Sequence, residues 1–171
     1  MIKIVGAILI IVATTLVGFE ISKRLSERPR QLRQLKSALQ SLEAEIMYGH
    51  TPLHEASRRL ASQLSHPVSL FFADFASRLT ETETTVMRAW ENSLKHIWKK
   101  TALKNSEFEI MKQFGETLGR HDRISQQKQI LLTLAHLERE EVDAHEKQAK
   151  YERMAKSLGF LSGLLLIILL M

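Results

Sequence analysis

The chain has 171 residues, of which 44% are hydrophobic and 25% are charged, and its formal net charge is +5. It contains no cysteine, which excludes disulfides, thiol chemistry and cysteine-ligated zinc or iron–sulfur sites. Leu, Gln, Glu, Lys, Arg and Ala dominate the middle of the chain while Val and Ile are sparse there, so helix is favoured over sheet.

The first element along the chain is an apolar segment over residues 4–21 that carries almost no charge. A helix of about 18 residues spans roughly 27 Å, close to the thickness of the hydrocarbon core of a bilayer. A cleaved signal peptide is the other interpretation, but only Lys3 charges the region before the segment and no Ala-x-Ala pattern ends it. We therefore predict an N-terminal transmembrane helix over residues 1–22.

The polar middle of the chain begins with three amphipathic helical patterns. The first ends near Gly49 and has a narrow apolar seam of Leu32, Leu35, Leu39, Leu42 and Ile46. Thr51 is predicted to cap the second helix, with Pro52 at its first helical position. Pro67 is predicted to start the third helix in the same way, and phenylalanines make one side of that helix apolar.

A fourth helix is expected from about residue 86, because Thr84 or Thr85 can act as its N-cap. It carries two tryptophans, Trp90 and Trp98, at helical spacing with other apolar residues. Aromatic residues in this pattern are more typical of a core than of a ligand-binding site.

A fifth helix is expected to open with a capping box formed by Ser106 and Glu109 and to stop near Gly119. Gly115 lies inside this helix, where glycine costs about 1 kcal/mol relative to alanine. Close approach of another helix is the usual compensation, and a tolerated glycine without a role is the other interpretation.

Asp122 is predicted to cap the sixth and longest helix, whose expected core face consists of Ile124, Leu131, Leu134, Ala135 and Leu137. Beyond Glu138 the apolar face thins, and the helix is charged on nearly all sides up to Lys156. A helix of this kind is either solvated or bridges to another part of the assembly. We predict that it runs on into the C-terminal apolar segment as one helix.

The last element is a short apolar segment over residues 157–171. A buried core helix is one interpretation of so short a segment. Residues 164–170 are apolar all round, however, which leaves no polar face and favours a second transmembrane helix. Gly159 and Gly163 form a G-x-x-x-G pair, which lets helix backbones approach closely, so both are candidates for packing between spans.

Basic residues beside the two apolar segments predict the orientation of the chain. The first segment is followed by Lys23, Arg24, Arg28, Arg30, Arg33 and Lys36, and the second is preceded by Lys147, Lys150, Arg153 and Lys156. By the positive-inside rule both clusters belong on the cytoplasmic side. The clusters also suit anionic lipid, although setting the topology is the simpler interpretation. The region over residues 23–156 is therefore expected to be a cytoplasmic domain.

The predicted fold is all-α: a six-helix antiparallel bundle flanked by an N-terminal and a C-terminal transmembrane helix. No G-x-x-x-x-G-K, G-x-G-x-x-G or G-x-S-x-G motif occurs, and the histidines are scattered. The basic residues do not interleave with aromatic ones in the manner of a nucleic-acid site. We therefore expect no catalytic residue, no metal, no cofactor and no nucleic-acid partner, and interpret the protein as a scaffold rather than an enzyme.

Several segments together resemble a known family. They are Glu27–Leu35, Ala38–Ile46, Tyr48–Leu53, Phe114–Gly119 with Asp122, and the apolar ending Leu158–Leu170. Over nearly the whole chain they resemble the stage III sporulation protein AB family. The segments around Pro29 and Pro52 are the specific part of the resemblance.

The resemblance implies an integral membrane protein of endospore-forming bacteria, in the mother-cell membrane that engulfs the forespore. It implies a part in a secretion-like channel complex required for forespore development. The family's helical domain is similar to the F platform components of type II secretion. This similarity implies coupling of a cytoplasmic secretion-type ATPase, the stage III sporulation protein AA, to membrane ring components. The F components have two such domains and three spans, so self-association is a further expectation.

On the platform interpretation, the charged helix over residues 138–156 is the expected lever. Its candidate partner-binding residues are Glu140, Glu141 and Asp143, and its candidate hinge is formed by Gly119 and Asp122. A plain helix end and a plain N-cap are the other interpretations of these last two residues.

A membrane-anchored sensor or signalling protein is the alternative function, because two spans flanking a helical bundle also describe a chemoreceptor input domain. In such a receptor the bundle lies outside the cell and a signalling module follows the second span. Here the charge pattern predicts a bundle inside, and we expect no signalling module after Met171, so the platform is favoured.

Overall fold

The computed structural model describes residues 26–45, 47–48, 51–81, 84–119 and 123–170, with side chains described up to residue 154 except at residues 123 and 152. Within these residues the protein is all-α and contains no strand. The chain divides into two compact units. One, which we call the bundle unit, is Arg28–Val142, and the other consists of Met1–Glu27 and Asp143–Met171.

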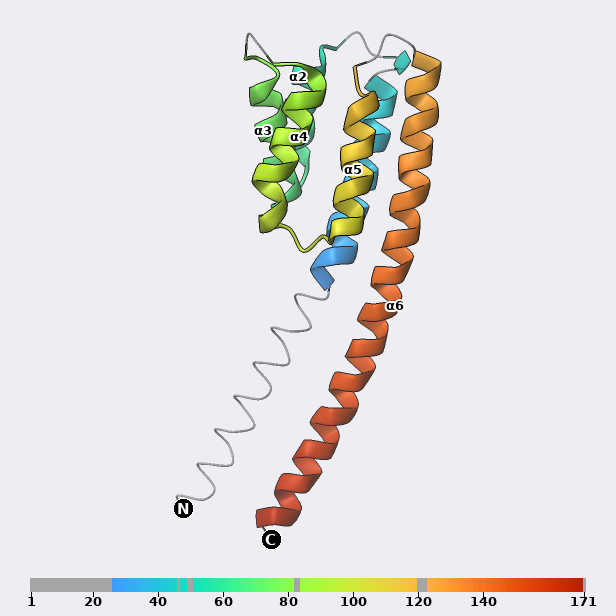
Figure 1. Ribbon diagram of the computed structural model, residues 1–171. Helices are drawn as coiled ribbons and strands as arrows, with labels where there is room; N and C mark the ends of the chain where they lie inside the picture. Colours follow the sequence, from blue (N-terminus) through green and yellow to red (C-terminus); the bar gives the residue numbers. More distant parts are fainter. Residues whose placement is uncertain (1–25, 46, 49–50, 82–83, 120–122, 171) are drawn as a thin grey trace. The chain divides into compact units, whose positions relative to one another are not determined.

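Six α-helices occur in the described residues, together with a short 3-10 turn (Figure 1). The first covers residues 26–45 and is called the 26–45 helix below. It is followed by α2 (Leu53–Gln63), α3 (Val68–Arg78), α4 (Val86–Ile97), η1 (Trp98–Lys100), α5 (Asn105–Thr117) and α6 (Arg123–Leu170).

Short connections make successive helices of the bundle unit run in opposite directions. Helix α2 packs on α3, α3 packs on α4, and α4 packs on α5. The turn between α4 and α5 therefore lies at the end of the bundle unit where the 26–45 helix begins (Figure 1). This part of the predicted antiparallel bundle is confirmed.

One of the predicted helix starts agrees with the structure and two are displaced by one residue. Thr85 is the N-cap of α4, and its side chain accepts a hydrogen bond from the backbone N–H of Arg88 at 3.3 Å. Pro67 is the N-cap of α3, which begins at Val68, and is therefore not its first helical residue. Pro52 is the N-cap of α2 rather than its first helical residue, because its ψ angle of 143° is extended.

The seam predicted for the first helix is confirmed within the described residues, where it forms part of the core. Its four leucines are at most 2% exposed: Leu32, Leu35, Leu39 and Leu42. The fifth seam residue, Ile46, and the predicted helix stop, Gly49, lie outside the described residues.

Trp90 of α4 lies at the centre of an aromatic cluster. Its fully buried ring meets the rings of Phe71, Phe75 and Phe114 edge-on, at centroid distances of 4.8, 4.9 and 5.2 Å. The indole N–H donates to the carbonyl oxygen of Met111 at 2.7 Å, so the one polar atom of the ring is satisfied. The predicted core role of Trp90 is confirmed.

Gly115 of α5 packs directly against this tryptophan. A β-carbon added at Gly115 would stand 2.1 Å from Cδ1 of Trp90, well inside van der Waals contact. Of the two interpretations of Gly115, the structure supports the close approach of another helix, because the α4 ring occupies the space of the missing side chain.

The predicted capping box of α5 is wrong. The N-cap is Lys104, and the carboxylate that accepts its backbone N–H belongs to Glu107, with Lys104 N to Glu107 Oε2 at 2.7 Å. Glu109 is exposed instead. Glu107 takes this position because a buried arginine pairs with its other oxygen, a long-range contact that the local pattern does not contain.

The core face predicted for the sixth helix is confirmed only at Leu137 and is wrong for Ile124, Leu131 and Ala135. Ile124 is 76% exposed and Leu131 is 53% exposed, whereas Leu137 is fully buried. The buried row of α6 consists of Gln126, Ile130, Thr133, Leu137, Glu141 and Ala144. Half of this row is polar, so a pattern based on apolar residues selects a different face.

The two predicted membrane spans stay predictions. Residues 1–22 lie outside the described residues, and residues 157–171 fall in the last part of α6, where only the backbone is described, as a helix through Leu170. Among the described residues, no helix combines the length and the apolar character that a membrane crossing needs. The prediction that the sixth helix continues unbroken is confirmed, since α6 has 48 residues.

Candidate functional site

A buried arginine, Arg28, joins three helices at the start of the bundle unit. Its Nε donates to Glu107 Oε1 at 2.7 Å, and its Nη2 donates to Glu140 Oε2 at 2.6 Å. The side chain of Arg28 is 8% exposed and that of Glu107 is fully buried. We call these three residues, from the 26–45 helix, α5 and α6, the Arg28 cluster.

The Glu107 carboxylate has hydrogen-bond partners on both oxygens. Arg28 occupies Oε1, while the backbone N–H of Lys104 and the hydroxyl of Ser106 donate to Oε2 at 2.7 and 3.2 Å. A charge can be buried at tolerable cost only when it is paired and hydrogen-bonded in this way. The cluster therefore fixes which helices meet here, because a different arrangement would leave buried charges unpaired.

A second group of ion pairs lies next to the Arg28 cluster, between the 26–45 helix and α6. Lys36 Nζ donates to Glu141 Oε2 at 2.8 Å, and Arg33 Nε donates to Glu141 Oε1 at 3.2 Å. Lys36 also pairs with Glu138. The side chain of Glu141 is 10% exposed, so this contact is part of the helix packing rather than of the surface.

Two opposing effects set the pKa of Glu141. Burial raises the pKa, but the hydrogen bonds and charges of Lys36 and Arg33 outweigh burial and hold it below its ordinary value. Glu141 is therefore ionised at neutral pH and contributes to the packing of α6 as a carboxylate.

The Arg28 cluster stands where the chain enters and leaves the bundle unit. The unit begins at Arg28 and ends at Val142, two residues beyond Glu140. The ion pair between Arg28 and Glu140 therefore joins the two crossing points within the unit. Chemically, the site fastens helices together, and no group of three or more metal-ligating side chains occurs among the described residues.

Comparisons with known proteins identify the family. A family model described as stage III sporulation protein AB matches residues 3–171. The chain belongs to the stage III sporulation protein AB family. The stage III sporulation protein AB of Bacillus subtilis (strain 168) is 61% identical over 171 residues, which cover 100% of both chains.

A solved structure of a stage III sporulation protein AB has the same fold. It is similar with a TM-score of 0.70 and 60% sequence identity, and the match covers 72% of this chain and 98% of that one. The all-α fold and the membership of a sporulation protein family are thereby established.

In this stage III sporulation protein AB family member, the three acidic residues predicted to bind a partner have different surroundings. Glu140 and Glu141 are engaged in ion pairs within the chain. Asp143 is partly exposed and pairs with Lys147 one turn further along α6, at 2.7 Å. Their role in partner binding stays a prediction, and of the three only Asp143 has a large exposed fraction, 42%.

The predicted hinge is only partly described. Gly119 has a φ of 86°, in the left-handed region that favours glycine, and an added β-carbon would stand 3.1 Å from Cβ of Val86. Asp122 lies outside the described residues. Gly159 and Gly163, predicted to pack between spans, lie in the helical backbone of α6, and nothing is described of their surroundings.

Sequence patterns alone do not reveal the two central residues of the site. They place Arg28 only among the basic residues that set orientation, and they favour Glu109 over Glu107. A signal for Glu107 does exist, because it stands three residues after Lys104, where a carboxylate can reach back to the N-cap N–H. Nothing local indicates the pairing with Arg28, which is 79 residues away.

Proposed function

We propose that this protein is a membrane platform in a secretion-like channel complex needed for endospore development. In this role it couples a cytoplasmic secretion-type ATPase, the stage III sporulation protein AA, to membrane ring components. ATP hydrolysis belongs to the partner, and this chain performs no catalysis. The proposal extends the family membership to a mechanical role.

The observation that carries the proposal is the ion pair between Arg28 and Glu140, with Nη2 to Oε2 at 2.6 Å. It joins the entry and exit of the bundle unit, so a force on this unit reaches both terminal segments through one fixed point. The helix that leaves the unit is unbroken from Arg123 to Leu170, which suits transmission along its axis.

The proposal includes two membrane anchors, residues 1–22 and 157–171, in the mother-cell membrane around the forespore. The bundle unit then lies on the cytoplasmic side. Basic residues beside both apolar segments support this orientation.

Because the chain has no cysteine, single cysteines can report its topology when it is expressed in non-sporulating cells, whose membrane faces the medium. We expect Ser77→Cys, on the exposed surface of α3, to react with a membrane-impermeant maleimide only after the cells are permeabilised. Lys3→Cys is expected to react in intact cells. Labelling of Ser77→Cys in intact cells would instead place the bundle unit outside, as the sensor alternative requires.

We place the partner contact on the exposed apolar stripe of α6. This stripe, called the α6 stripe below, consists of Ile124, Leu131, Ala135 and Val142, which share one helical face. Ile124, Leu131 and Val142 are 76, 53 and 49% exposed. Exposed apolar residues that gather on one helical face suit a protein–protein contact, and the charged groups of Glu140 and Glu141 are already used inside the chain.

A photo-cross-linking residue at position 131 tests the partner contact in sporulating cells. We expect it to capture the secretion-type ATPase, whereas the same residue at Arg58, exposed on α2, captures none. Capture of a second copy of this chain would assign the α6 stripe to self-association. Equal capture from both positions would refute the assignment of the stripe.

A further inference from the structure

The turn between α4 and α5 carries three exposed lysines, Lys99, Lys100 and Lys104. None of them forms an ion pair with any residue that the structure describes, whereas Lys95 nearby pairs with Glu91. Residues 98–106 contain no acidic residue. We call residues 98–104 the lysine turn, and its positive charge is not neutralised from within the segment.

The acidic residue that follows the lysine turn is already neutralised. Glu107 is fully buried and pairs with Arg28 at 2.6 Å. Its second oxygen accepts the backbone N–H of Lys104, which leaves the ammonium group of that lysine free. The turn itself therefore carries charge of one sign only.

Long-range contacts hold the lysine turn beside the first residues of the bundle unit. The Oε1 atom of Gln31 accepts a hydrogen bond from the backbone N–H of Ala102 at 2.8 Å. Arg28, three residues earlier, binds Glu107 at the start of α5. Figure 1 shows the same arrangement, with the connection from α4 to α5 next to the start of the 26–45 helix.

The residues beside the lysine turn, Arg28 and Gln31, are close along the chain to the proposed first anchor. Arg28 is six positions after residue 22, and six steps along the chain reach at most about 20 Å in any conformation. If residues 1–22 lie in the membrane, Arg28 stays within about 20 Å of the end of this anchor, so this end of the bundle unit can approach the membrane surface. This step rests on the proposed function.

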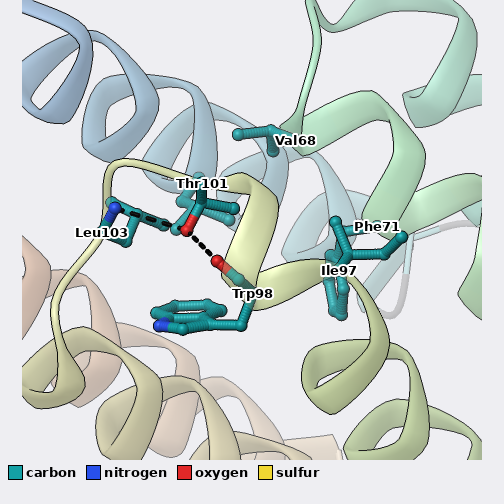
Figure 2. Close-up of a pocket in the computed structure, with 7 residues that line it drawn as sticks. Val68, Phe71, Ile97, Trp98, Thr101 and Leu103 are labelled. Carbon is teal, nitrogen blue, oxygen red and sulfur yellow. Dashed lines mark hydrogen bonds between the residues drawn. The ribbon is translucent and has the colours of Figure 1, made fainter. Parts of the chain in front are cut away.

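Hydrogen bonds fix the shape of the lysine turn. The hydroxyl of Thr101 donates to the carbonyl oxygen of Trp98 at 2.7 Å and accepts the backbone N–H of Leu103 at 3.3 Å (Figure 2). The indole N–H of Trp98 donates to the carbonyl oxygen of Lys104 at 3.3 Å. The backbone that carries the lysines is thus ordered before any ligand arrives, which lowers the entropic cost of binding.

A small apolar pocket under the turn bears on whether a lipid tail or a lipid headgroup could bind there. Trp98, Thr101 and Leu103 line it together with Val68, Phe71 and Ile97 (Figure 2). Its volume of about 10 Å³ admits little more than one water molecule. An acyl chain does not fit there, so this pocket offers no site for a lipid tail, and the exposed lysines are the groups that can meet a headgroup.

We propose that the lysine turn binds the anionic phospholipid headgroups of the membrane in which the chain is anchored. Lysines near an anionic bilayer each strengthen binding about fivefold at physiological salt. This contact would hold the end of the bundle unit that contains the Arg28 cluster against the membrane surface. It is distinct from the basic residues beside the two spans, which set topology.

The test uses the full chain reconstituted into phosphatidylcholine vesicles, with or without phosphatidylglycerol. A fluorophore is attached to Asn105→Cys, exposed beside Lys104, and a lipid carries a quencher on its headgroup. We expect phosphatidylglycerol to increase quenching and high salt to reverse the increase, because screening weakens exposed charges. A fluorophore on Ser77→Cys, at the far end of α3, is the position control and is expected to change little.

A triple variant isolates the lysines. Replacing Lys99, Lys100 and Lys104 by glutamine is expected to abolish the increase caused by phosphatidylglycerol. The matched control removes the same charge from exposed positions elsewhere, Arg58, Arg88 and Lys128, and should keep the increase. Unchanged tryptophan emission shows that each variant is folded, since both tryptophans lie in this unit.

The outcomes separate this inference from the proposed function. A chain that stays in the vesicles through a high-salt wash, with quenching that depends on the three lysines, supports both. If the chain stays in the vesicles but the quenching depends neither on phosphatidylglycerol nor on the lysines, the inference is overturned and the proposed anchors are unaffected. A chain that salt removes from the vesicles overturns the anchors and the inference together.

Discussion

At the scale of single residues, the contact between Gly115 and Trp90 determines how α4 and α5 pack. The Trp90 ring touches three phenylalanines and donates its N–H to Met111, so it has little freedom to move. A β-carbon at position 115 would approach the ring to 2.1 Å, and a rotation of the ring does not relieve this clash. Helix propensity alone favours alanine at this position, and packing opposes it.

We expect Gly115→Ala to lower the free energy of unfolding by about 2 kcal/mol, since overpacking outweighs the gain in helix propensity. Chemical denaturation followed by tryptophan fluorescence measures the change. Gln113→Ala, at an exposed position of the same helix, is the control and should stay within about 0.5 kcal/mol of the wild type. A stabilised Gly115→Ala variant would show that Trp90 can shift.

Glu141 gives a prediction about pH at the same scale. Its pKa in the folded protein is below the ordinary value, because hydrogen bonds from Lys36 and Arg33 outweigh burial. Its contribution to stability is therefore present above the unfolded-state pKa of about 4.3 and is lost as the pH falls through the folded-state pKa.

Replacing Glu141 by glutamine should lower stability at neutral pH and reduce the loss on acidification. Denaturation midpoints at neutral pH and at a pH below the unfolded-state pKa measure this difference for both proteins. Glu146→Gln, at an exposed position of α6, should follow the wild-type profile. If Glu141→Gln also keeps the wild-type slope, Glu141 does not act through its charge.

At the scale of the helix, α6 has two rows of residues on different faces, and only one of them packs into the core. One is the α6 stripe, which is exposed, and the other is the buried row that contains Ile130 and Leu137. The buried row packs into the core although half of its residues are polar, because its polar groups have hydrogen-bond partners. Thr133 donates to the carbonyl oxygen of Gln129 at 2.8 Å, and Glu141 is bound by the 26–45 helix.

The two rows respond differently to truncation. We expect Leu137→Ala to cost about 3 kcal/mol, because it leaves a cavity at a fully buried position. Leu131→Ala, a matched truncation at an exposed position of the same helix, should cost less than about 0.5 kcal/mol. Thermal unfolding of both variants measures the difference, and equal losses would contradict the register of α6 described above.

At the scale of the whole molecule, the chain crosses between its two units after Glu27 and after Val142. The pair of Arg28 with Glu140 ties these crossings together on the side of the bundle unit. Glu140 is 25% exposed, while Glu107 remains as a second partner of Arg28. The connection can therefore be removed without leaving a buried charge unpaired.

Glu140→Ala is expected to reduce the yield of heat-resistant spores about tenfold or more while lowering stability by only about 1 kcal/mol. Spore counts and a fluorescence-detected thermal unfolding curve measure the two effects separately. Glu138→Ala removes a more exposed carboxylate of α6, 58% exposed, and should leave the spore yield unchanged. A normal yield for Glu140→Ala would remove the mechanical role of this ion pair.

Local patterns predicted much of the bundle. The leucine seam of the first helix and the Thr85 cap follow from spacing and residue type, because each depends on residues within a few turns of one another. At Gly115 the sequence left tight packing and a tolerated glycine both open, and the contact with Trp90 decides for tight packing. The Arg28 cluster could not be predicted in this way, since its members are 79 and 112 residues apart.

The sequence by itself determined that the described chain is helical and which family it belongs to, because residue composition, helical spacing and family motifs are local properties. Only the tertiary structure decided which face of α6 is buried and that Arg28, Glu107 and Glu140 meet. The physical reason is that a charged side chain can enter the core only where a distant helix places a partner within hydrogen-bond distance.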